Sequence, residues 1–200
     1  MTGYALAYRL GYAPWERYRT MAAPSIGALL DREADERSRV LGRALDLGCG
    51  RGGYTRWLAD SGWEAVGVDA VPRAVEEARA AAVPGASFVV GDVTDLRATD
   101  LGRFDLFLDV GCLQGLDAGG RAAVGRGVTA LAHPGATALV LAFGPSPLRR
   151  VVGGLSREDV EAAFPGWTVL SVEPAETAGL GWPMNRTAPQ WYRLRWPGRG

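Results

Sequence analysis

A run of glycines near position 50 has the residue types best suited to bind a nucleotide-like ligand. The segment from Ala44 to Gly53 reads ALDLGCGRGG, so a short apolar stretch leads directly into a glycine-rich turn. Glycine permits a tight turn and lets the backbone approach a ligand closely. The spacing Gly48-x-Gly50-x-x-Gly53 also matches a dinucleotide-binding loop, and taken alone it does not identify the ligand.

Three aspartates, each at the end of an apolar run, narrow the choice of ligand. Asp46 lies two residues before Gly48, where a carboxylate favours a cationic group, directly or through water, and repels a pyrophosphate. Asp69 occupies the position, about 20 residues after the glycine loop, that hydrogen-bonds ribose hydroxyls. Asp92 suits an adenine amino group, and Val93 offers the ring an apolar contact. A single aspartate at a strand end is more often a cap or turn former, but three in succession favour a ligand site.

An alternating α/β architecture would bring these residues together. Short apolar runs predict strands, and the segments between them predict helices, with one uncertain helical piece after Asp95. Continuous apolar runs are typical of strands buried on both faces, so the alternation predicts a parallel sheet covered by helices on both faces. Ligands bind such sheets at the carboxyl ends of the strands. The expected strands span 44–47, 65–68, 87–90, 105–110 and 137–142, and the expected helices span 54–59, 73–82 and 120–131.

The two ends of the chain differ from this core. Ser156 with Asp159 predicts a capped helix, and 167–172 and 190–195 read as two strands that form an antiparallel edge. Near the start, 24–30 reads as a helix with Pro24 in its first turn. We expect one domain over 1–200, with an N-terminal helical and aromatic lid segment over 1–40 and the core over 41–200.

Composition excludes several classes of protein. The 200-residue chain has a formal net charge of zero and no lysine, which argues against a protein that coats nucleic acid. Two cysteines and one histidine do not readily make a disulfide framework or a zinc site. No secretory signal or membrane-spanning run is visible. These features predict a soluble cytoplasmic protein, monomeric or homodimeric, without a metal and without nucleic-acid or membrane partners.

The glycine loop and its acids resemble the motifs of class I S-adenosylmethionine (SAM)-dependent methyltransferases. Asp46-x-Gly48-x-Gly50-x-Gly52, Asp69 and Asp92 look like the first three motifs of that family, and 104–109 looks like the fourth. Residues 131–136 resemble its Leu-x-x-Pro-Gly-Gly turn before the fifth strand, with Ala136 in place of the second glycine. The resemblance covers 43–142. It implies a Rossmann-like, seven-stranded, mostly parallel sheet whose last strand is antiparallel, and SAM as cofactor with S-adenosylhomocysteine as product. The cofactor-binding residues it implies are Asp46, Gly48, Cys49, Gly50, Gly52, Asp69, Ala70, Asp92, Val93, Asp109 and Val110.

The chain ends are similar to a small-molecule branch of this family, the thiopurine, thiol, halide and tellurite-type methyltransferases. The similar segments are Pro14-Trp15-Glu16, where Glu16 replaces an aspartate, and 191–194. We expect an in-line methyl transfer to a small-molecule acceptor, for which the protein aligns the nucleophile and excludes water. The expected substrate-binding residues are Tyr12, Trp15, Cys112, Gln114, Trp182 and Arg186. Packing roles fit Trp15 equally well and Cys112 better, and a plain surface loop accounts for Arg186 equally well.

No catalytic residue can be assigned from the sequence. Asp109 and Gln114 are the candidates for acid–base help and for orienting an acceptor. Three other functions compete with methyl transfer. A nicotinamide oxidoreductase is disfavoured by Asp46 and by the missing lysine of a Tyr-Lys dyad. An RNA methyltransferase is disfavoured because no aromatic and basic platform is visible. A non-methylating SAM-binding protein stays open, since fold and cofactor do not fix chemistry.

Overall fold

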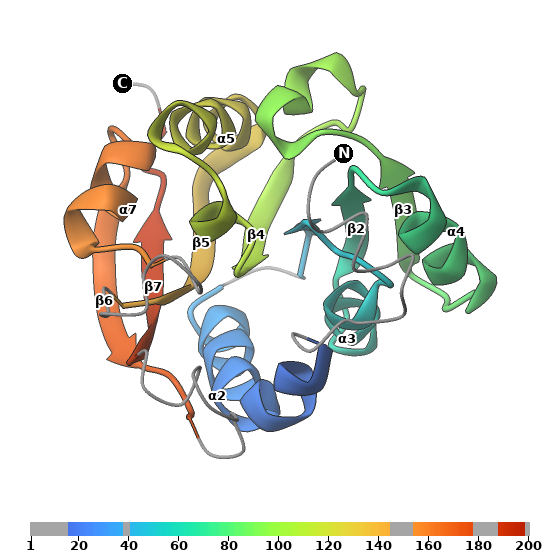
Figure 1. Ribbon diagram of the computed structural model, residues 1–200. Coiled ribbons are helices and arrows are strands. Elements are labelled where there is room, and N and C mark those ends of the chain that lie inside the picture. The colour runs from blue at the N-terminus through green and yellow to red at the C-terminus, as the bar shows by residue number, and fades with distance from the viewer. Residues whose placement is uncertain (1–15, 38–40, 145–153, 178–187, 199–200) are drawn as a thin grey trace.

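The computed structural model describes the backbone of residues 16–37, 41–144, 154–177 and 188–198, and the side chains of these ranges from residue 25 onward. Seven strands form one sheet in the order β3-β2-β1-β4-β5-β7-β6 (Figure 1). The strands are β1 (Arg43–Leu47), β2 (Glu64–Asp69), β3 (Ala86–Val90), β4 (Phe104–Val110), β5 (Ala132–Phe143), β6 (Thr168–Pro174) and β7 (Pro189–Arg195).

Strands β1 to β5 pair in parallel, and β7 runs antiparallel to both of its neighbours, so six of the seven strands point the same way. The pairs β1–β2, β1–β4, β2–β3 and β4–β5 are parallel, while β7 pairs antiparallel with both β5 and β6. This arrangement confirms the predicted fold, with its last strand antiparallel. The expected antiparallel edge is refined in one respect, because β7 lies inside the sheet and β6 is the outer strand.

Helices cover both faces of the sheet, as the strand composition predicts. The helices α2 (Glu16–Asp35), α3 (Gly53–Asp60) and α4 (Pro72–Ala80) pack on one face. The other face is covered by the 3₁₀ segment η1 (Val93–Ala98) and by α5 (Ala118–Leu131) and α7 (Arg157–Ala163). The short 3₁₀ turn η2 (Leu113–Gly115) follows β4. Ser156 and Asp159 form the expected capping box at the start of α7.

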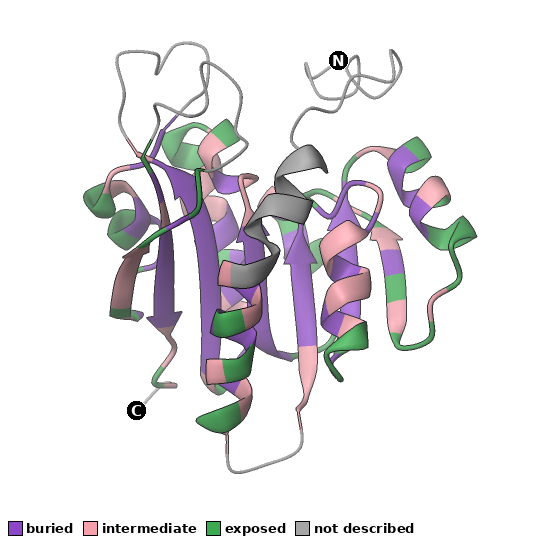
Figure 2. Cartoon of the chain, turned by 90° about the horizontal axis from the view of Figure 1, so that it is seen from below, coloured by how far each residue is buried: buried purple, intermediate pink, exposed green. Residues whose placement is uncertain are grey.

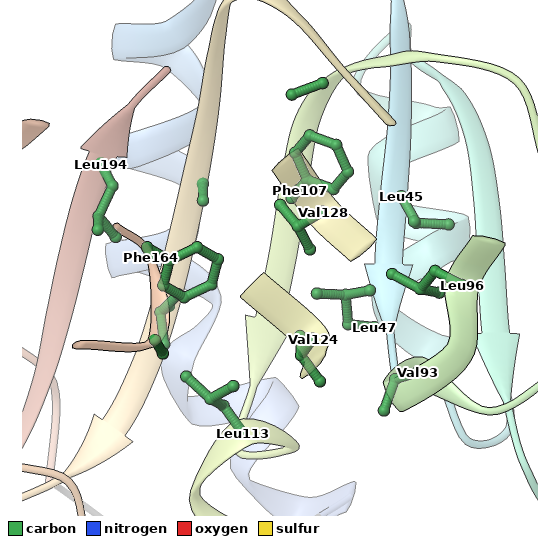
Figure 3. Close-up of a cluster of buried hydrophobic side chains, with 14 of the residues drawn as sticks. Leu45, Leu47, Val93, Leu96, Phe107, Leu113, Val124, Val128, Phe164 and Leu194 are labelled. Carbon is green, nitrogen blue, oxygen red and sulfur yellow. The ribbon is translucent and has the colours of Figure 1, made fainter. Parts of the chain in front are cut away.

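Two buried clusters, one on each face, hold these layers together. Leu45, Phe107 and Val128 belong to the cluster between the sheet and α5, part of which is drawn in Figure 3. On the opposite face, Ile26 and Leu29 of α2 pack into a second cluster with strand and α3 side chains. Figure 2 shows buried residues running through the central strands while exposed residues lie on the outer sides of the helices. The strands are therefore fixed from both sides, and their ends are held in place.

Two boundaries predicted from the sequence are wrong. The helix expected to start near Pro24 begins at Glu16, so Pro24 lies inside α2 rather than in its first turn. The proline–glycine turn expected before the fifth strand lies within β5, where the register with β4 shifts between Phe104 and Leu106. Gly135 has a φ of 81°, and its N–H donates to the Trp196 carbonyl. Pairing with the chain after β7 thus extends β5 through the predicted turn.

Candidate cofactor and active site

The carboxyl ends of the parallel strands meet at one edge of the sheet, which we call the carboxyl edge. In the strand register Asp46 of β1 lies beside Gly67, Leu47 lies beside Asp109, and Asp69 lies beside Val90. The acids at the ends of β1, β2 and β4 are therefore neighbours in space. The glycine loop (48–53), the segment 91–93 after β3 and the segment 111–116 after β4 surround them.

The glycine loop takes a backbone path that side chains would block. Gly48, Gly50 and Gly52 have φ values of 70°, 53° and 74°. A Cβ at Gly48 would lie 2.8 Å from the Cys112 Sγ, and one at Gly52 would lie 2.3 Å from the Phe88 ring. These glycines supply the left-handed backbone of the tight turn that the sequence pattern predicted, and they leave room for the Cys112 and Phe88 side chains.

Asp69 ties the glycine loop to the end of β2. Its Oδ2 accepts the Gly50 N–H at 2.8 Å and its Oδ1 accepts the Val71 N–H at 2.8 Å. Gly48 and Cys49 add two backbone bonds to the Val68 carbonyl. Each carboxylate oxygen can accept a further hydrogen bond, so the position stays compatible with the expected ribose contact while it also shapes the loop.

Asp46 is buried behind the loop. Its side chain is almost inaccessible, and its Oδ2 accepts the Thr55 hydroxyl at 2.6 Å. Burial, together with the nearby Asp69, raises the pKa of Asp46 from 3.8 to about 7, although the hydrogen bond from Thr55 opposes this rise. The predicted role, favouring a cationic part of the ligand, would have to act from this buried position.

Asp109 organises the segment that follows β4. Its two oxygens accept the N–H groups of Cys112 and Leu113 at 3.0 and 2.9 Å. Burial raises its pKa from 3.8 to about 7, with a smaller contribution from the charge of Asp46. The sequence makes Asp109 a candidate for acid–base help. In this geometry both of its oxygens bind the turn at η2.

The remaining sequence candidates after β4 also make defined contacts. The Gln114 Oε1 accepts the Phe143 N–H at 3.0 Å, which ties η2 to the end of β5. Cys112 packs against Gly48, and burial raises the pKa of its thiol. Cys49 is buried against Gly67, and burial likewise raises the pKa of its thiol. Val110, the last residue of β4, is half-buried. Both thiols are therefore held in their neutral form.

At the end of β3, Asp92 begins η1. Its Oδ1 accepts the N–H and the hydroxyl of Thr94 at 2.8 and 2.7 Å. Asp92 is exposed and Val93 is buried, while Ala70 after β2 is exposed. Asp69, Asp92 and Asp109 thus each bind a backbone N–H of the loop that follows or of the loop beside it, while Asp46 binds a helix hydroxyl. This is the capping role that the sequence alone left open as the alternative.

Four predicted substrate residues lie outside the described residues. These are Tyr12 and Trp15 before α2, and Trp182 and Arg186 between β6 and β7. The single histidine, His133, lies at the start of β5. That position is at the opposite, amino edge of the sheet, remote from the acids.

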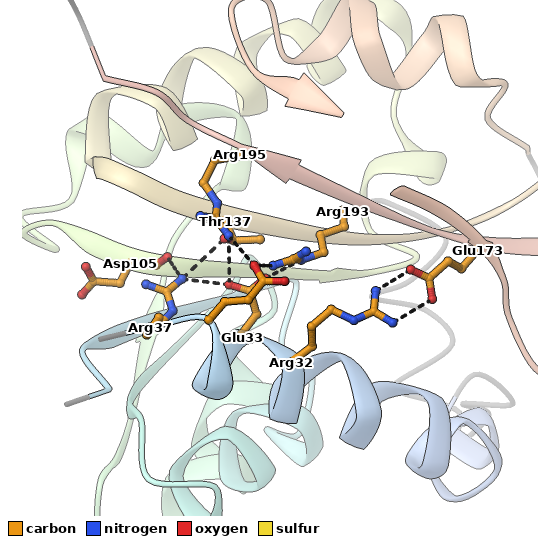
Figure 4. Close-up of polar contacts among 9 residues, drawn as sticks. Arg32, Glu33, Arg37, Asp105, Thr137, Glu173, Arg193 and Arg195 are labelled. Carbon is orange, nitrogen blue, oxygen red and sulfur yellow. Dashed lines mark hydrogen bonds and ion pairs between the residues drawn. The ribbon is translucent and has the colours of Figure 1, made fainter. Parts of the chain in front are cut away.

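A buried ion cluster between α2 and β7 was missed in the sequence (Figure 4). Glu33, which has no exposed surface, pairs with the Arg193 Nε at 2.5 Å and with Arg37 at 3.0 Å. Glu36 pairs with Arg193 and Arg195. Glu33 lies in the last turn of α2 and Arg37 lies two residues beyond its end; in a helical sequence such a pair, four residues apart, usually marks a solvated face. The available signal was Arg193, which lies between the apolar residues Tyr192 and Leu194 in a strand predicted from the sequence.

A hollow of about 430 Å³ lies away from the acids of the carboxyl edge. It is bounded by the loop 97–103 and by Ala130 and Leu131 at the end of α5. These residues precede β4 and β5, so the hollow opens at the amino edge, where none of the sequence candidates lies. The clustered carboxylates, rather than this hollow, mark the candidate site.

The residues at the carboxyl edge fit SAM better than they fit a dinucleotide. Asp46, Asp69, Asp92 and Asp109 gather there, and Arg51 in the loop is engaged by Glu77 at 2.6 Å. Such an acidic edge attracts a sulfonium cation and repels a pyrophosphate. The described residues at this edge that would hold SAM are the glycine loop, Asp69 for the ribose, and Asp92 with Val93 for the adenine.

The parallel sheet, the glycine turn and the acids at successive strand ends define a Rossmann-like methyltransferase fold. Comparison with known proteins gives the same class. Residues 44–135 match the family model described as a methyltransferase domain. A 2-heptyl-1-hydroxyquinolin-4(1H)-one methyltransferase from Mycobacteroides abscessus is 30% identical over 154 residues, covering 73% of this chain and 67% of that protein. The chain belongs to the class I SAM-dependent methyltransferases, and its cofactor is SAM.

Solved structures show the same fold. The N-methyltransferase NodS from Bradyrhizobium japonicum, in complex with S-adenosyl-L-homocysteine, superposes with a TM-score of 0.69 at 21% identity, covering 96% of this chain and 92% of that one. A TehB-like SAM-dependent methyltransferase from Corynebacterium glutamicum gives 0.65 at 19% identity, covering 96% and 97%. No helix in the described part of the chain is long and apolar enough to cross a membrane.

Proposed function

We propose that this enzyme methylates a small aromatic acceptor through an oxygen that ionises by itself, such as the N-hydroxyl of a 1-hydroxyquinolone. The observation that carries the proposal is the 30% identity to the 2-heptyl-1-hydroxyquinolin-4(1H)-one methyltransferase, which spans about two thirds of that protein. The choice of the hydroxyl oxygen as the acceptor atom is our own inference from the chemistry of the site.

The described part of the carboxyl edge offers poor candidates for a general base. Asp109 has both oxygens bound to backbone N–H groups, and the Cys112 thiol is held neutral by burial. His133 is at the other edge. Hydroxyl and amine acceptors usually require a base, whereas an acidic N-hydroxyl, a thiol or a halide supplies its own anion. An acceptor that supplies its own anion therefore suits the residues at the carboxyl edge.

SAM supplies a methyl group already activated on a sulfonium sulfur, so the protein's task is alignment and the exclusion of water. The η2 segment is rigidly anchored for that task, since Asp109 holds its start and Gln114 ties it to β5. Cys112 and Gln114 would then form one wall of the acceptor site. The glycine loop, Asp69 and Asp92 would hold the cofactor opposite this wall.

We also propose that residues 1–40 close this site over the core formed by 41–200, with Tyr12 and Trp15 as contacts to the acceptor. The direction of α2 supports this. The Ser25 hydroxyl bonds Trp191, which pairs with Leu141 near the end of β5. Glu33 bonds Arg193, which pairs with Leu139, two residues nearer the amino edge. The chain therefore enters α2 at the carboxyl edge. Trp182 and Arg186 are proposed as further acceptor contacts.

A methyl-transfer assay with matched acceptors tests the proposal. We expect 2-heptyl-1-hydroxyquinolin-4-one to be methylated, with release of S-adenosylhomocysteine, and we expect 2-heptylquinolin-4-one, which lacks the N-hydroxyl, to react at least about a hundredfold more slowly. Thiol and iodide acceptors form the comparison arms. Equal rates with and without the N-hydroxyl, or turnover of thiols or iodide alone, would refute this acceptor class.

A further inference from the structure

Three residues from three elements meet behind the glycine loop. Asp46 belongs to β1, Thr55 to α3 and Gly67 to β2. Thr55 has no exposed surface and Asp46 only 2%. The Thr55 hydroxyl donates to the Asp46 Oδ2 at 2.6 Å. A buried carboxylate thus receives a donor from the first turn of a helix.

Gly67 leaves the space in which this contact forms. It lies beside Asp46 in the β1–β2 register. A Cβ at position 67 would lie 2.5 Å from the Thr55 Oγ1 and 2.8 Å from the Cys49 Sγ, closer than packed atoms approach. A glycine inside a buried strand usually marks such a close approach. The Thr55 hydroxyl and the Cys49 side chain fill the space that a side chain at position 67 would need, which explains why a glycine lies there.

The Asp46–Thr55 bond closes the glycine loop at its base. Asp46 precedes Gly48 by two residues, and Thr55 follows Gly53 by two residues. The two bonded side chains therefore flank the loop on either side and fix the distance between its ends. Gly52, which precedes α3, has no side chain to cap this helix, and the helix is tied to β1 by the bond from the Thr55 hydroxyl to Asp46.

We propose that Thr55 is a positioning residue for the cofactor: by holding the ionised Asp46 carboxylate it fixes the glycine loop in the conformation that binds SAM. This inference rests on SAM as the cofactor and not on the proposed acceptor. A failure of the acceptor proposal would therefore leave the role of Thr55 untouched. Thr55 is outside the residues that the sequence motif marks, and its contribution acts through Asp46.

The charge of Asp46 depends on this hydroxyl. The ionisable groups that face Asp46 are Asp69 of β2, Asp109 of β4, and the thiols of Cys49 and Cys112. None of them is a cation, so the Thr55 hydroxyl is the described group that favours ionisation. The pKa of Asp46 is already raised to about 7. Loss of the hydroxyl raises it further, and the carboxylate is then protonated near neutral pH.

The test is calorimetric SAM binding from pH 5.5 to 8.5 with Thr55→Val, Thr55→Ser and Thr129→Val. Thr129 is the matched control, because it is another helical threonine whose hydroxyl is hydrogen-bonded, to the Gly125 carbonyl and the Trp167 Nε1–H, but it lies on the opposite face of the sheet, in α5. We expect Thr55→Val to weaken SAM binding roughly tenfold at pH 7 and to move the pH midpoint of binding upward. Thr55→Ser and Thr129→Val should bind SAM as the unaltered protein does.

Unchanged SAM affinity and pH midpoint in Thr55→Val would overturn the proposal, as would equal defects in Thr55→Val and Thr55→Ser. If Thr55→Val does not fold, the coupling between SAM binding and the ionisation of Asp46 is measured in the unaltered protein. The ¹³C carboxyl signal of Asp46, assigned with Asp46→Asn, should titrate near pH 7 without SAM and at lower pH with SAM. A midpoint that SAM does not move would contradict the coupling.

Discussion

At the scale of single residues, the acids of the carboxyl edge have two roles that the sequence could not separate. Their positions follow from the spacing of apolar runs and glycines, and the structure places them together as expected. Their backbone partners could not be predicted, because the bonds from Asp69 to Gly50 and from Asp46 to Thr55 depend on strand register and helix placement. We therefore expect the same aspartate side chains both to bind the ligand and to hold the loops in place.

Asp69→Asn tests this double role. The amide keeps the shape of the side chain but has one acceptor oxygen in place of two, so it cannot accept the Gly50 and Val71 N–H groups together with two ribose hydroxyls. We expect SAM affinity to fall roughly tenfold or more in calorimetry. Asp100→Asn, an exposed acid before β4, is the control. Wild-type affinity in Asp69→Asn would remove Asp69 from the cofactor site.

Gly67→Ala tests the close packing beneath the loop. The added methyl would lie 2.5 Å from the Thr55 hydroxyl oxygen, so α3 must move or the bond to Asp46 must break. We expect destabilisation by about 1–3 kcal/mol in urea denaturation, together with weaker SAM binding. Gly135→Ala is a useful comparison for space, because a Cβ there meets nothing within 4 Å, although its φ of 81° adds backbone strain. Tight SAM binding by Gly67→Ala would show that this packing does not support the loop.

At the scale of elements, the alternation of strands and helices was predictable while the two ends of the sheet were less so. Hydrophobic runs located β1, β2 and β4 because these strands are buried on both faces, whereas β3, the outer strand beside β2, buries only Phe88. The extension of β5 past Pro134 depends on pairing with the chain near Trp196, which is distant in sequence. The extent of α2 depends on burial of Ile26, Leu29 and Leu30 against the sheet, which local propensity does not reveal.

The buried ion cluster predicts that α2 is fixed to β7 largely through Glu33. Removing this carboxylate leaves Arg37 and Arg193, both more than nine-tenths buried, without their shared partner. We expect Glu33→Ala to destabilise the protein by about 3 kcal/mol, because removing one partner of a buried ion pair leaves the other charge buried and uncompensated. For a domain of this size that lowers Tm by roughly 6–12 °C. Glu161→Ala, which removes an exposed pair with Arg157, should leave Tm nearly unchanged, and equal Tm values for the two variants would contradict the interpretation.

At the scale of the whole molecule, the two edges of the sheet differ in how their charges are compensated. The carboxyl edge gathers aspartates that bind backbone N–H and hydroxyl groups, whereas the contact between α2 and β7 gathers arginines paired with glutamates (Figure 4). The acids of the carboxyl edge therefore have no paired arginine among the contacts of the described residues, which suits a cationic cofactor.

This arrangement predicts an unusual pH dependence of stability. Asp46 and Asp109 have pKa values of about 7 in the folded protein and ordinary values near 3.8 when unfolded. The folded state then binds protons that the unfolded state does not, so stability rises as pH falls from about 8 to about 5. Below that range the trend reverses, since the pKa values of Glu36, Glu77 and Glu173 are lowered by their arginine partners.

Urea denaturation at pH 5, 6, 7 and 8 without SAM measures this dependence. Each of the two aspartates contributes at most roughly 1.4 kcal/mol per pH unit. The doubly substituted Asp46→Asn, Asp109→Asn protein should lose the trend. Stability that increases with pH over this interval would show that the two carboxylates are ionised in the folded protein.

The central claim is that SAM binds at the carboxyl edge, between the glycine loop and the acids of β2 and β3. Amide hydrogen exchange with and without SAM tests it most directly. We predict that SAM slows exchange in the glycine loop 48–53 and in the segments 69–71 and 91–94, and leaves the hollow at 97–103 and the ion cluster at 33–37 unchanged. Protection confined to the hollow or to the α2–β7 contact, with the glycine loop unaffected, would contradict the claim.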